Sequence, residues 1–203
     1  MPREIVGVIL AGGESRRMGT DKAFLKIGGV SLMERTVQTL LLLFPTVAIV
    51  SKEPEKFHPL KGISLIQDLF PEQHALGGVY SALRRFQRQD CFVFACDMPF
   101  LNPLLIRTMI EQRNGYDLFI PRSRHGLEPL HAIYTSRCLS TMIQQIERKE
   151  WNLETFVQKV HYGILDAGVL HAFDPEEASF LNVNTPEAFQ KAQTLLLDFS
   201  KNV

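Results

Sequence analysis

Cysteine is scarce in this sequence of 203 residues, which contains only Cys91, Cys96 and Cys138. No pair of cysteines has the C-x-x-C spacing. Cys91 and Cys96 are predicted on one strand at an odd spacing, which directs their side chains to opposite faces. We therefore expect neither a disulfide framework nor a structural zinc site, and the three thiols favour a reducing cytoplasm.

Excess charge of one sign is missing as well. Lys plus Arg and Asp plus Glu number 22 each, so the formal net charge is zero. We expect no surface that coats nucleic acid or an acidic membrane, and any bound anion must be held by local placement of charge. The longest apolar stretch, LLLLFPTVAIV, is interrupted by Pro45, and the apolar run after Glu4 is too short for a signal peptide. We therefore expect a cytoplasmic protein.

Several common catalytic signatures are also absent. The sequence has no G-x-S-x-G, no Walker A motif and no G-x-G-x-x-G, and no cysteine has a recognisable catalytic partner. The six histidines show no metal-ligand spacing. His131, in EPLHAIY, is expected to be a structural residue with its hydrogen bonds satisfied.

What the sequence does contain is an alternation of strands and helices. Its hydrophobic pattern predicts strands at 5–10, 46–51, 62–68, 91–97 and 116–121, and helices at 31–44, 76–86 and 104–113. Ser31 with Glu34 has the spacing of a capping box, and Asn102 with Pro103 has that of a helix start. This order predicts a parallel sheet covered by helices on both faces.

The pattern loosens after about residue 121. Residues 122–129 are polar and are predicted to form a loop, and LHAIYT predicts a strand that is added in the antiparallel sense. Helices are expected at 136–149 and 152–159, a strand at 161–166, a helix start at Asp174, and a closing helix from Thr185 and Pro186. We predict one three-layer α/β/α domain over residues 1–203 with a mostly parallel sheet.

The first predicted strand runs directly into the loop LAGGESRRMGTDK. Gly12, Gly13 and Gly19 permit backbone angles that let amide N–H groups converge on an anion. Arg16, Arg17 and Lys22 add positive charge to the same segment. The absence of apolar periodicity argues against a packing role. The loop is therefore predicted to hold phosphate.

Four polar features are expected at the carboxyl ends of the strands, where open α/β sheets bind ligands. They are the loop 12–22, Asp68, Asp97 and the pair Asn182 and Asn184. Asp97 follows the buried run FVFAC, and a carboxylate there beside bound phosphates is a suitable ligand for Mg²⁺. Asp97 as a cap of the next turn, and Asp68 as an ordinary turn residue, remain the structural alternatives.

Together these segments resemble a known family. LAGGESRRMGTDK is similar to the LAGGxSxRMGxDK signature of nucleotidyltransferases, most closely the molybdenum cofactor guanylyltransferases (the MobA family). LGGVYSAL, CDMPFL, EPLHAIY and FLNVNTPEAF resemble the other segments of that family, in order along nearly the whole chain. The resemblance implies a Rossmann-like nucleotidyltransferase fold and the transfer of GMP from GTP, with Mg²⁺, to the terminal phosphate of molybdopterin.

The resemblance also implies roles for individual residues. Backbone groups of Leu10, Ala11 and Gly12 would hold the nucleotide, and Lys22 and Arg17 would contact its phosphates. Asp68 and Gly77 would lie near the nucleoside, and Asp97 would bind Mg²⁺ and the phosphates. Lys22, Asp97 and Arg17 would carry the catalysis. Asn182 or Asn184 would assist on the acceptor or metal side.

By the same resemblance, residues 1–121 would form the nucleotide-binding part, and residues 122–203 the acceptor-side part with the closing helix. GTP and molybdopterin would be the substrates. The assignment is compatible with transient contact with other proteins of molybdenum cofactor biosynthesis or with acceptor enzymes. No partner is expected among nucleic acids or membranes.

The sequence departs from the family pattern at two places. Ser51-Lys52 stands where an asparagine often follows the second strand, and Glu128 replaces the histidine of the usual HPL. The alternatives are a cytidylyltransferase acting on molybdopterin or another phosphate acceptor, and a nucleotide-binding regulator without catalysis.

Overall fold

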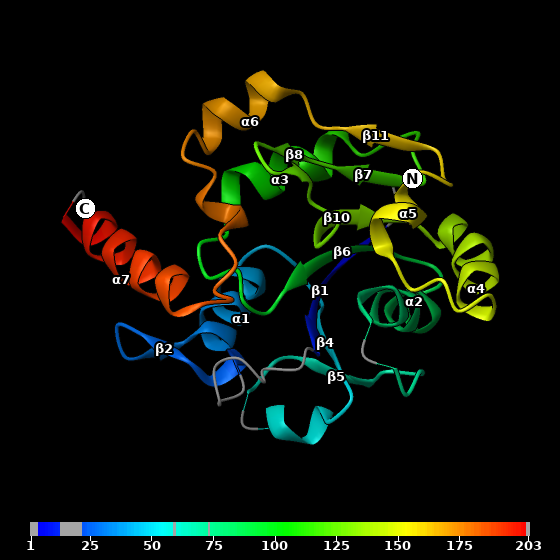
Figure 1. Cartoon of the computed structure of the whole chain (residues 1–203), viewed down its shortest axis with the longest axis horizontal. Helices are drawn as coiled ribbons and strands as arrows, with labels where there is room; N and C mark the ends of the chain where they lie inside the picture. The colour runs from blue at the N-terminus through cyan, green and yellow to red at the C-terminus, as the bar shows by residue number, and fades with distance from the viewer. Residues whose placement is uncertain (1–3, 13–21, 59, 73, 202–203) are drawn as a thin grey trace.

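A sheet of seven strands forms the middle layer of the computed structural model, which describes residues 4–12, 22–58, 60–72 and 74–201. The strand order is β11-β7-β10-β6-β1-β4-β5, from the top to the bottom of Figure 1. The strands are β1 (Ile5–Ala11), β4 (Val47–Ser51), β5 (Ser64–Gln67), β6 (Asp90–Ala95), β7 (Leu118–Ile120), β10 (His131–Tyr134) and β11 (Tyr162–Ile164). The predicted strands are thus confirmed, with ends shifted by one or two residues.

One strand of this sheet runs against the others. β1 is parallel to β4 and β6, β4 is parallel to β5, and β11 is parallel to β7, whereas β10 is antiparallel to both β6 and β7. The prediction of a mostly parallel sheet with an antiparallel strand at 130–135 is confirmed. Because β10 begins where its neighbours end, the residues just before it lie at the carboxyl edge of the parallel strands.

Helices cover both faces of the sheet (Figure 1). One apolar core joins the sheet to α2 (Ala75–Arg85), α4 (Leu139–Glu147) and α5 (Leu153–Val157). A second core, on the opposite face, joins it to α1 (Leu32–Leu41), α3 (Pro103–Gln112) and α6 (Ala167–Phe173). Alternate residues of β1 divide between the two cores, Val6 and Val8 entering the first and Ile9 the second. The predicted three-layer arrangement is confirmed.

The closing helix α7 (Pro186–Lys201) packs on a small hairpin instead of the main sheet. The hairpin consists of β2 (Lys26–Ile27) and β3 (Val30–Ser31), joined by Gly28 and Gly29. These glycines have φ values of 61° and 83°, the left-handed backbone that a two-residue hairpin turn requires. Ile27 and Leu32 form a third core with Val183 and Ala192.

The predicted helix starts are confirmed at three places. The Ser31 side chain accepts the Glu34 N–H, and the Glu34 carboxylate accepts the Ser31 N–H, which completes a capping box. Asn102 accepts the N–H groups of Leu104 and Leu105. Thr185 Oγ1 accepts the Ala188 N–H ahead of α7.

Three segments after residue 121 differ from the prediction, and one of them is α6, which forms where no helix was expected. The expected loop 122–129 contains a second small hairpin, β8 (Arg122–Ser123) and β9 (Gly126–Leu127). Asp174 does not start an α-helix, because it follows the end of α6 and accepts the N–H groups of Ala178 and Ser179, both at 2.9 Å. Only a 3₁₀ turn, η4 (Ala178–Phe180), follows. Three further 3₁₀ turns are η1 (Lys22–Phe24), η2 (Pro54–Phe57) and η3 (Ser136–Cys138).

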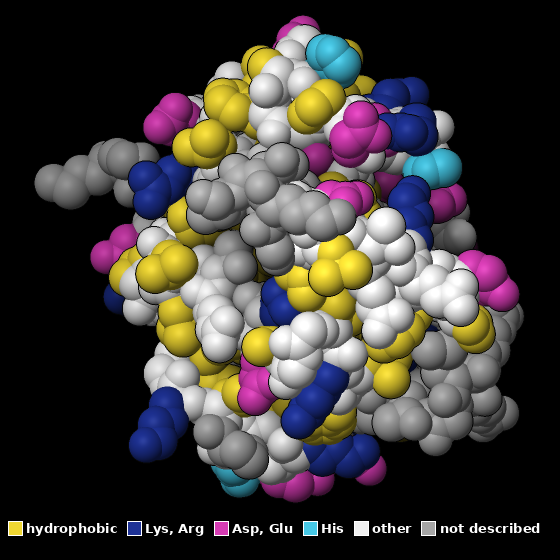
Figure 2. All heavy atoms as spheres, turned by 90° about the vertical axis from the view of Figure 1, so that its left-hand side faces the viewer, with side chains coloured by type: hydrophobic (Ala, Val, Ile, Leu, Met, Phe, Trp, Pro, Cys, Tyr) yellow, Lys and Arg dark blue, Asp and Glu magenta, His cyan; other side chains and the backbone are white. Residues whose placement is uncertain are grey.

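Among the described residues on the face drawn in Figure 2, basic and acidic side chains are interspersed. This agrees with the zero net charge of the sequence. Within the described ranges, no helix has both the length and the apolar character that spanning a membrane would need.

His131, at the start of β10, is fully buried. Its ring makes edge-to-face contacts with Phe92, Phe94 and Phe180, with centroids 5.1–5.4 Å apart. Neither ring nitrogen has a hydrogen-bond partner among the described residues. The expectation of a structural histidine is confirmed, but the expectation that its hydrogen bonds are satisfied is wrong. Burial lowers its pKa from 6.5 to about 3.

This burial predicts a loss of stability in mild acid. Below pH 6.5 the unfolded chain protonates His131 while the folded protein keeps it neutral until about pH 3, so the free energy of unfolding falls as pH falls through that window. The contribution is up to about 1.4 kcal/mol per pH unit. Urea unfolding of the natural protein and of His131→Phe, followed between pH 7 and pH 4, should give a flatter pH profile for the variant. If the unfolding free energies of both proteins changed equally with pH, the pH dependence would not come from the burial of His131.

Candidate functional site

A cavity of about 530 Å³ lies at the carboxyl edge of the parallel strands. Its floor comes from the ends of β1, β4 and β6, and its walls come from segments before α2, before β10 and before α7. We call it the first cavity. It is lined by Leu10, Ala11, Gly12, Lys22, Ser51, Lys52, Glu53, Lys56, Ala75, Ala95, Cys96, Asp97, Leu130, Asn182 and Asn184.

The first cavity brings together most of the residues that the sequence singled out. Leu10, Ala11 and Gly12 end the first strand there, Lys22 and Asp97 face the same space, and both asparagines join from the far end of the chain. The predicted convergence of these segments on one sheet edge is therefore correct. Arg16 and Arg17 lie outside the described residues, as do Gly13 and Gly19.

Asp97 is a partly buried carboxylate two residues beyond the end of β6. Burial raises the pKa of Asp97, and the positive charge of Lys22 opposes that increase. The Lys22 ammonium offsets part of the cost of burying this carboxylate, and a bound cation would offset more of it.

The segment before α7 is fixed to this carboxylate through the backbone. The Val183 N–H donates to the Asp97 carbonyl at 3.0 Å, and Val183 itself is fully buried in the third core. The residue after Val183 is Asn184, and its Oδ1 accepts a hydrogen bond from Lys22 Nζ. The hairpin and α7 thus hold Asn182 and Asn184 against the strand ends.

Asp68 lies beside the first cavity, in a side cavity of about 20 Å³ that shares Leu10, Gly12, Ser51, Lys52 and Ala75 with it. Its carboxylate pairs with Lys52 Nζ at 3.1 Å, accepts the Ser81 hydroxyl at 2.8 Å and the Phe70 N–H at 3.3 Å. Lys52 also donates to the carbonyls of Phe70 and Glu72. Asp68 is therefore more than an ordinary turn residue, because it fixes the segment between β5 and α2.

Gly77 lies one position away from the side cavity, within α2. A Cβ on Gly77 would come within 3.2 Å of the Phe70 ring. Its neighbour Gly78 lines the side cavity, and a Cβ there would come within 3.2 Å of Leu10 Cδ2. The paired glycines let α2 approach the end of β1 closely. The structure thus places Gly78, and not Gly77, at the cavity wall.

Sequence reasoning missed Lys52, Lys56 and Glu53 as lining residues. Lys56 pairs with Glu53 on η2, and Lys52 reaches the site from the end of β4. With Lys22 and Asp97, the described lining holds three cations and two carboxylates. The signal was present in the sequence, because Ser51-Lys52 follows a buried strand at the ligand-binding edge.

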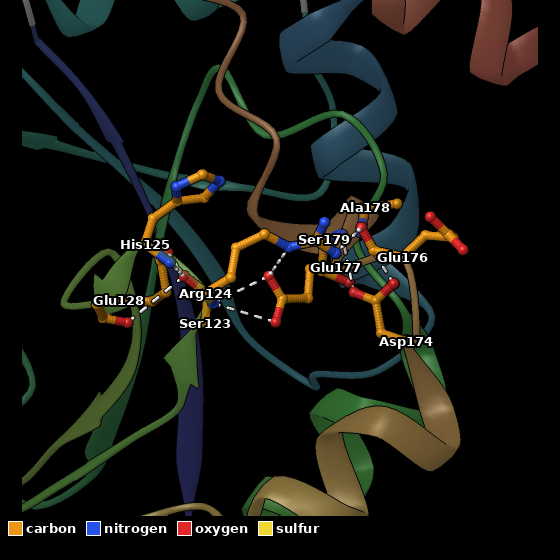
Figure 3. A network of polar contacts seen from close by, with 10 residues as sticks. Ser123, Arg124, His125, Glu128, Asp174, Glu176, Glu177, Ala178 and Ser179 are labelled. Carbon is orange, nitrogen blue, oxygen red and sulfur yellow. Dashed lines mark hydrogen bonds and ion pairs between the residues drawn. The ribbon is translucent and has the colours of Figure 1, made fainter.

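A second cavity, of about 510 Å³, adjoins the first and shares Leu130 and Asn182 with it. Four carboxylates and two cations line it, namely Glu128, Glu154, Glu176, Glu177, Arg124 and Lys191. Figure 3 shows the polar network at its wall, in which Arg124 extends to Glu177 and Glu128 contacts Ser123. The two adjoining cavities therefore differ in the sign of their lining charge.

No group of three or more His, Cys, Asp and Glu side chains within the described ranges is placed to hold a metal ion. The first cavity offers the Asp97 carboxylate, with amide oxygens of Asn182 and Asn184 nearby. Mg²⁺ is commonly held by one or two carboxylates, substrate phosphates and water. The donor set fits Mg²⁺ that arrives with a phosphate ligand and does not fit an all-protein metal site.

Comparison with known proteins gives concordant results. The sequence profile of the MobA-like NTP transferase domain matches residues 7–160. The chain is 34% identical over 201 residues to a probable molybdenum cofactor guanylyltransferase of Natranaerobius thermophilus, covering 97% of this chain and 98% of that protein. It is 31% identical to a molybdenum cofactor guanylyltransferase of Desulfosudis oleivorans, covering 95% and 96% of the two chains. The crystal structure of molybdopterin-guanine dinucleotide biosynthesis protein A from Archaeoglobus fulgidus superimposes with a TM-score of 0.84 at 26% identity, covering 95% and 99%.

The Lys52–Asp68 pair should contribute measurably to stability. Lys52→Met removes the ammonium from a carboxylate whose side chain is only 9% exposed, so unfolding free energy should fall by about 1–3 kcal/mol. Lys56→Met is the matched control, because its pair with Glu53 is roughly half exposed and should be worth less than about 1 kcal/mol. Urea titrations of the two variants should separate them, and similar losses for both would contradict a specific role for Lys52.

Proposed function

The chain belongs to the family of MobA-like NTP transferase domains, and from this we propose that it transfers GMP from GTP to the terminal phosphate of molybdopterin. The products are molybdopterin guanine dinucleotide and pyrophosphate. The observation that carries the proposal is the junction of two cavities at Leu130 and Asn182, with Lys22 and Asp97 on the side of the first cavity. Two substrates can meet there end to end.

The first cavity is the proposed GTP site. Leu10, Ala11 and Gly12 line it where β1 ends, and their backbone groups would bind the nucleotide. Lys22 also lines it and donates a hydrogen bond to Asn184, in the segment before α7. Asp68, and with it the paired glycines of α2, would lie on the nucleoside side. We assign Arg17 to the phosphates by its place in the same loop, as the sequence predicts.

The second cavity is the proposed molybdopterin site. Apart from Met98, its lining residues come from residues 124–195, which agrees with the expectation that residues 122–203 supply the acceptor-side part. We accordingly assign nucleotide binding to residues 1–121 and acceptor binding to residues 122–203 of one domain. Leu130 and Asn182 would separate the α-phosphate of GTP from the pterin.

The reaction requires charge neutralisation more than proton transfer. An oxygen of the acceptor phosphate attacks the α-phosphorus of GTP, and the bond from that phosphorus to the pyrophosphate oxygen breaks. The attacking oxygen is already anionic, so no strong general base is needed. Lys22 and Arg17 would hold the two anions together and offset the charge on the leaving pyrophosphate. Mg²⁺, held by Asp97 and the phosphates, would supply Lewis-acid stabilisation of the same charge.

The setting of this reaction is proposed from the sequence. Cys91, Cys96 and Cys138 are thiols, which is consistent with a reducing cytoplasm. There the chain would receive molybdopterin from, and pass its product to, other proteins of molybdenum cofactor biosynthesis or acceptor enzymes.

Nucleotide selectivity tests the proposal directly. The protein is incubated with molybdopterin, Mg²⁺ and each of GTP, CTP, ATP and UTP, and pyrophosphate release is followed. GTP should give the fastest release, and calorimetric titration should give the tightest binding for GTP. Equal or faster release with CTP would replace the guanylyltransferase by a cytidylyltransferase. Binding of GTP without any release would favour a regulator.

Asp97→Asn tests the metal-binding role. The substitution keeps the shape of the side chain but removes the charge that would hold Mg²⁺. Turnover should fall at least roughly a hundredfold, by analogy with the loss of one oxyanion donor, while affinity for GTP falls much less. The melting temperature should stay or rise, because burial disfavours the carboxylate. Near-normal Mg²⁺-dependent turnover would remove Asp97 from the mechanism.

A further inference from the structure

The second cavity poses a physical problem for the proposed function. Its acceptor ends in a phosphate, yet the described lining carries four carboxylates against two cations. Arg124 is already engaged, because its Nε lies 2.7 Å from Glu177 Oε2 and its backbone N–H lies 3.1 Å from each oxygen of that carboxylate. Such a cavity suits the part of the acceptor that carries hydrogen-bond donors, and not its phosphate.

The fold holds Glu128 in place through the backbone of the turn that precedes β10. Its N–H donates to the Pro121 carbonyl at 3.1 Å and its carbonyl accepts the His131 N–H at 2.9 Å. Next to it, the Tyr134 hydroxyl donates to the Pro129 carbonyl at 2.7 Å, and the Ala95 N–H donates to the Leu130 carbonyl at 3.2 Å. The turn before β10 is thus fixed to β6, to β10 itself and to the residue that follows β7.

The Glu128 side chain retains acceptor capacity. Among the described residues it accepts one hydrogen bond, from the Ser123 hydroxyl to Oε1 at 2.6 Å, which fixes its direction. Oε2 and the remaining lone pairs of Oε1 are left to accept further donors. Figure 3 shows the Arg124 side chain turned away from Glu128 toward Glu177. The Arg124 guanidinium therefore does not pair with the Glu128 carboxylate. Partial burial raises the pKa of Glu128, with the hydrogen bond from Ser123 acting in the opposite direction.

We propose that Glu128 determines the specificity of the acceptor site by binding the donor edge of the pterin ring. That edge presents the ring N3–H and the 2-amino group side by side, which matches the two oxygens of one carboxylate. This inference rests on the proposed function, since it takes the second cavity as the molybdopterin site. Glu128 touches the substrate at a point remote from the reacting phosphate.

The same chemistry explains why the two cavities do not exchange their ligands. Guanine carries the same pair of donors as a pterin, so the edge alone cannot distinguish GTP from the acceptor. The charge of each cavity makes the distinction. Four carboxylates in the second cavity repel a triphosphate, whereas Lys22, Lys52 and Lys56 in the first attract it.

The test replaces one donor of the probe by an acceptor. Binding of 6-hydroxymethylpterin and of 6-hydroxymethyllumazine, in which an oxo group replaces the 2-amino group, is followed by pteridine fluorescence with GTP present. The natural protein should bind the pterin at least about tenfold more tightly, because lumazine opposes an oxygen to the carboxylate. Glu128→Gln offers one donor and one acceptor, so its preference should vanish or reverse.

Glu176→Gln is the matched control, since it removes one exposed carboxylate from the same cavity. It should keep the preference for the pterin. Both variants should keep the melting temperature and the affinity for GTP, and Glu128→Gln should raise KM for molybdopterin about tenfold or more with a smaller change in kcat.

The outcomes separate this inference from the proposed function. If the natural protein transfers GMP to molybdopterin but Glu128→Gln leaves the pterin preference unchanged, the role of Glu128 is refuted and the function stands. Loss of the preference in both variants refutes a specific role for Glu128, since charge alone would then decide. If the preference depends on Glu128 and no GMP is transferred, the pterin site stands and the proposed function fails.

Discussion

The antiparallel direction of β10 determines which residues lie at the carboxyl edge of the parallel strands. β10 is hydrogen-bonded to β6 and β7 in the antiparallel sense, so the turn that precedes it arrives at the edge where all its neighbours end. With a fully parallel sheet, residues 128–130 would lie at the opposite edge, away from Asp97. The junction between the two cavities at Leu130 therefore exists because of this reversal.

The two cavities share a wall but present opposite electrostatic environments. In the first, a desolvated carboxylate at Asp97 is balanced by Lys22, and added phosphate would be attracted by the cations around it. In the second, carboxylates predominate, and the basic side chain Arg124 is held by Glu177. Under the proposed function, this charge would draw the triphosphate into the first cavity, so that the phosphate ends of the two substrates would meet at the shared wall.

The sequence predicted the sheet and the first cavity because both follow from local signals. Buried apolar runs ended by a polar residue place Gly12, Asp68 and Asp97 at strand ends, and parallel strands end together. The motif around Asn182 and Asn184 added the far end of the chain by resemblance. The capping rules placed the starts of α1, α3 and α7, since each depends on neighbouring residues only.

What escaped prediction depends on contacts between distant residues. The Asp174 region has the local pattern of a helix start, yet Glu177 adopts a left-handed backbone with φ of 54° and pairs with Arg124, 53 residues earlier in the chain. Lys52 gains its role from Asp68, the residue that follows the neighbouring strand β5. The lining of the second cavity depends on the pairing of Arg124 with Glu177, which are distant in the chain. No local sequence pattern therefore predicted this cavity.

The hydrogen bond from Val183 to Asp97 joins a late segment of the chain to the end of β6, which implies an order of events during synthesis. The last strand of the main sheet ends at Ile164, whereas the residues that close the first cavity begin at Asn182 and are held there by α7. A growing chain on the ribosome therefore possesses every strand of its main sheet before it possesses the asparagines that line the first cavity. The first cavity is complete only after α7 has emerged and docked on the hairpin.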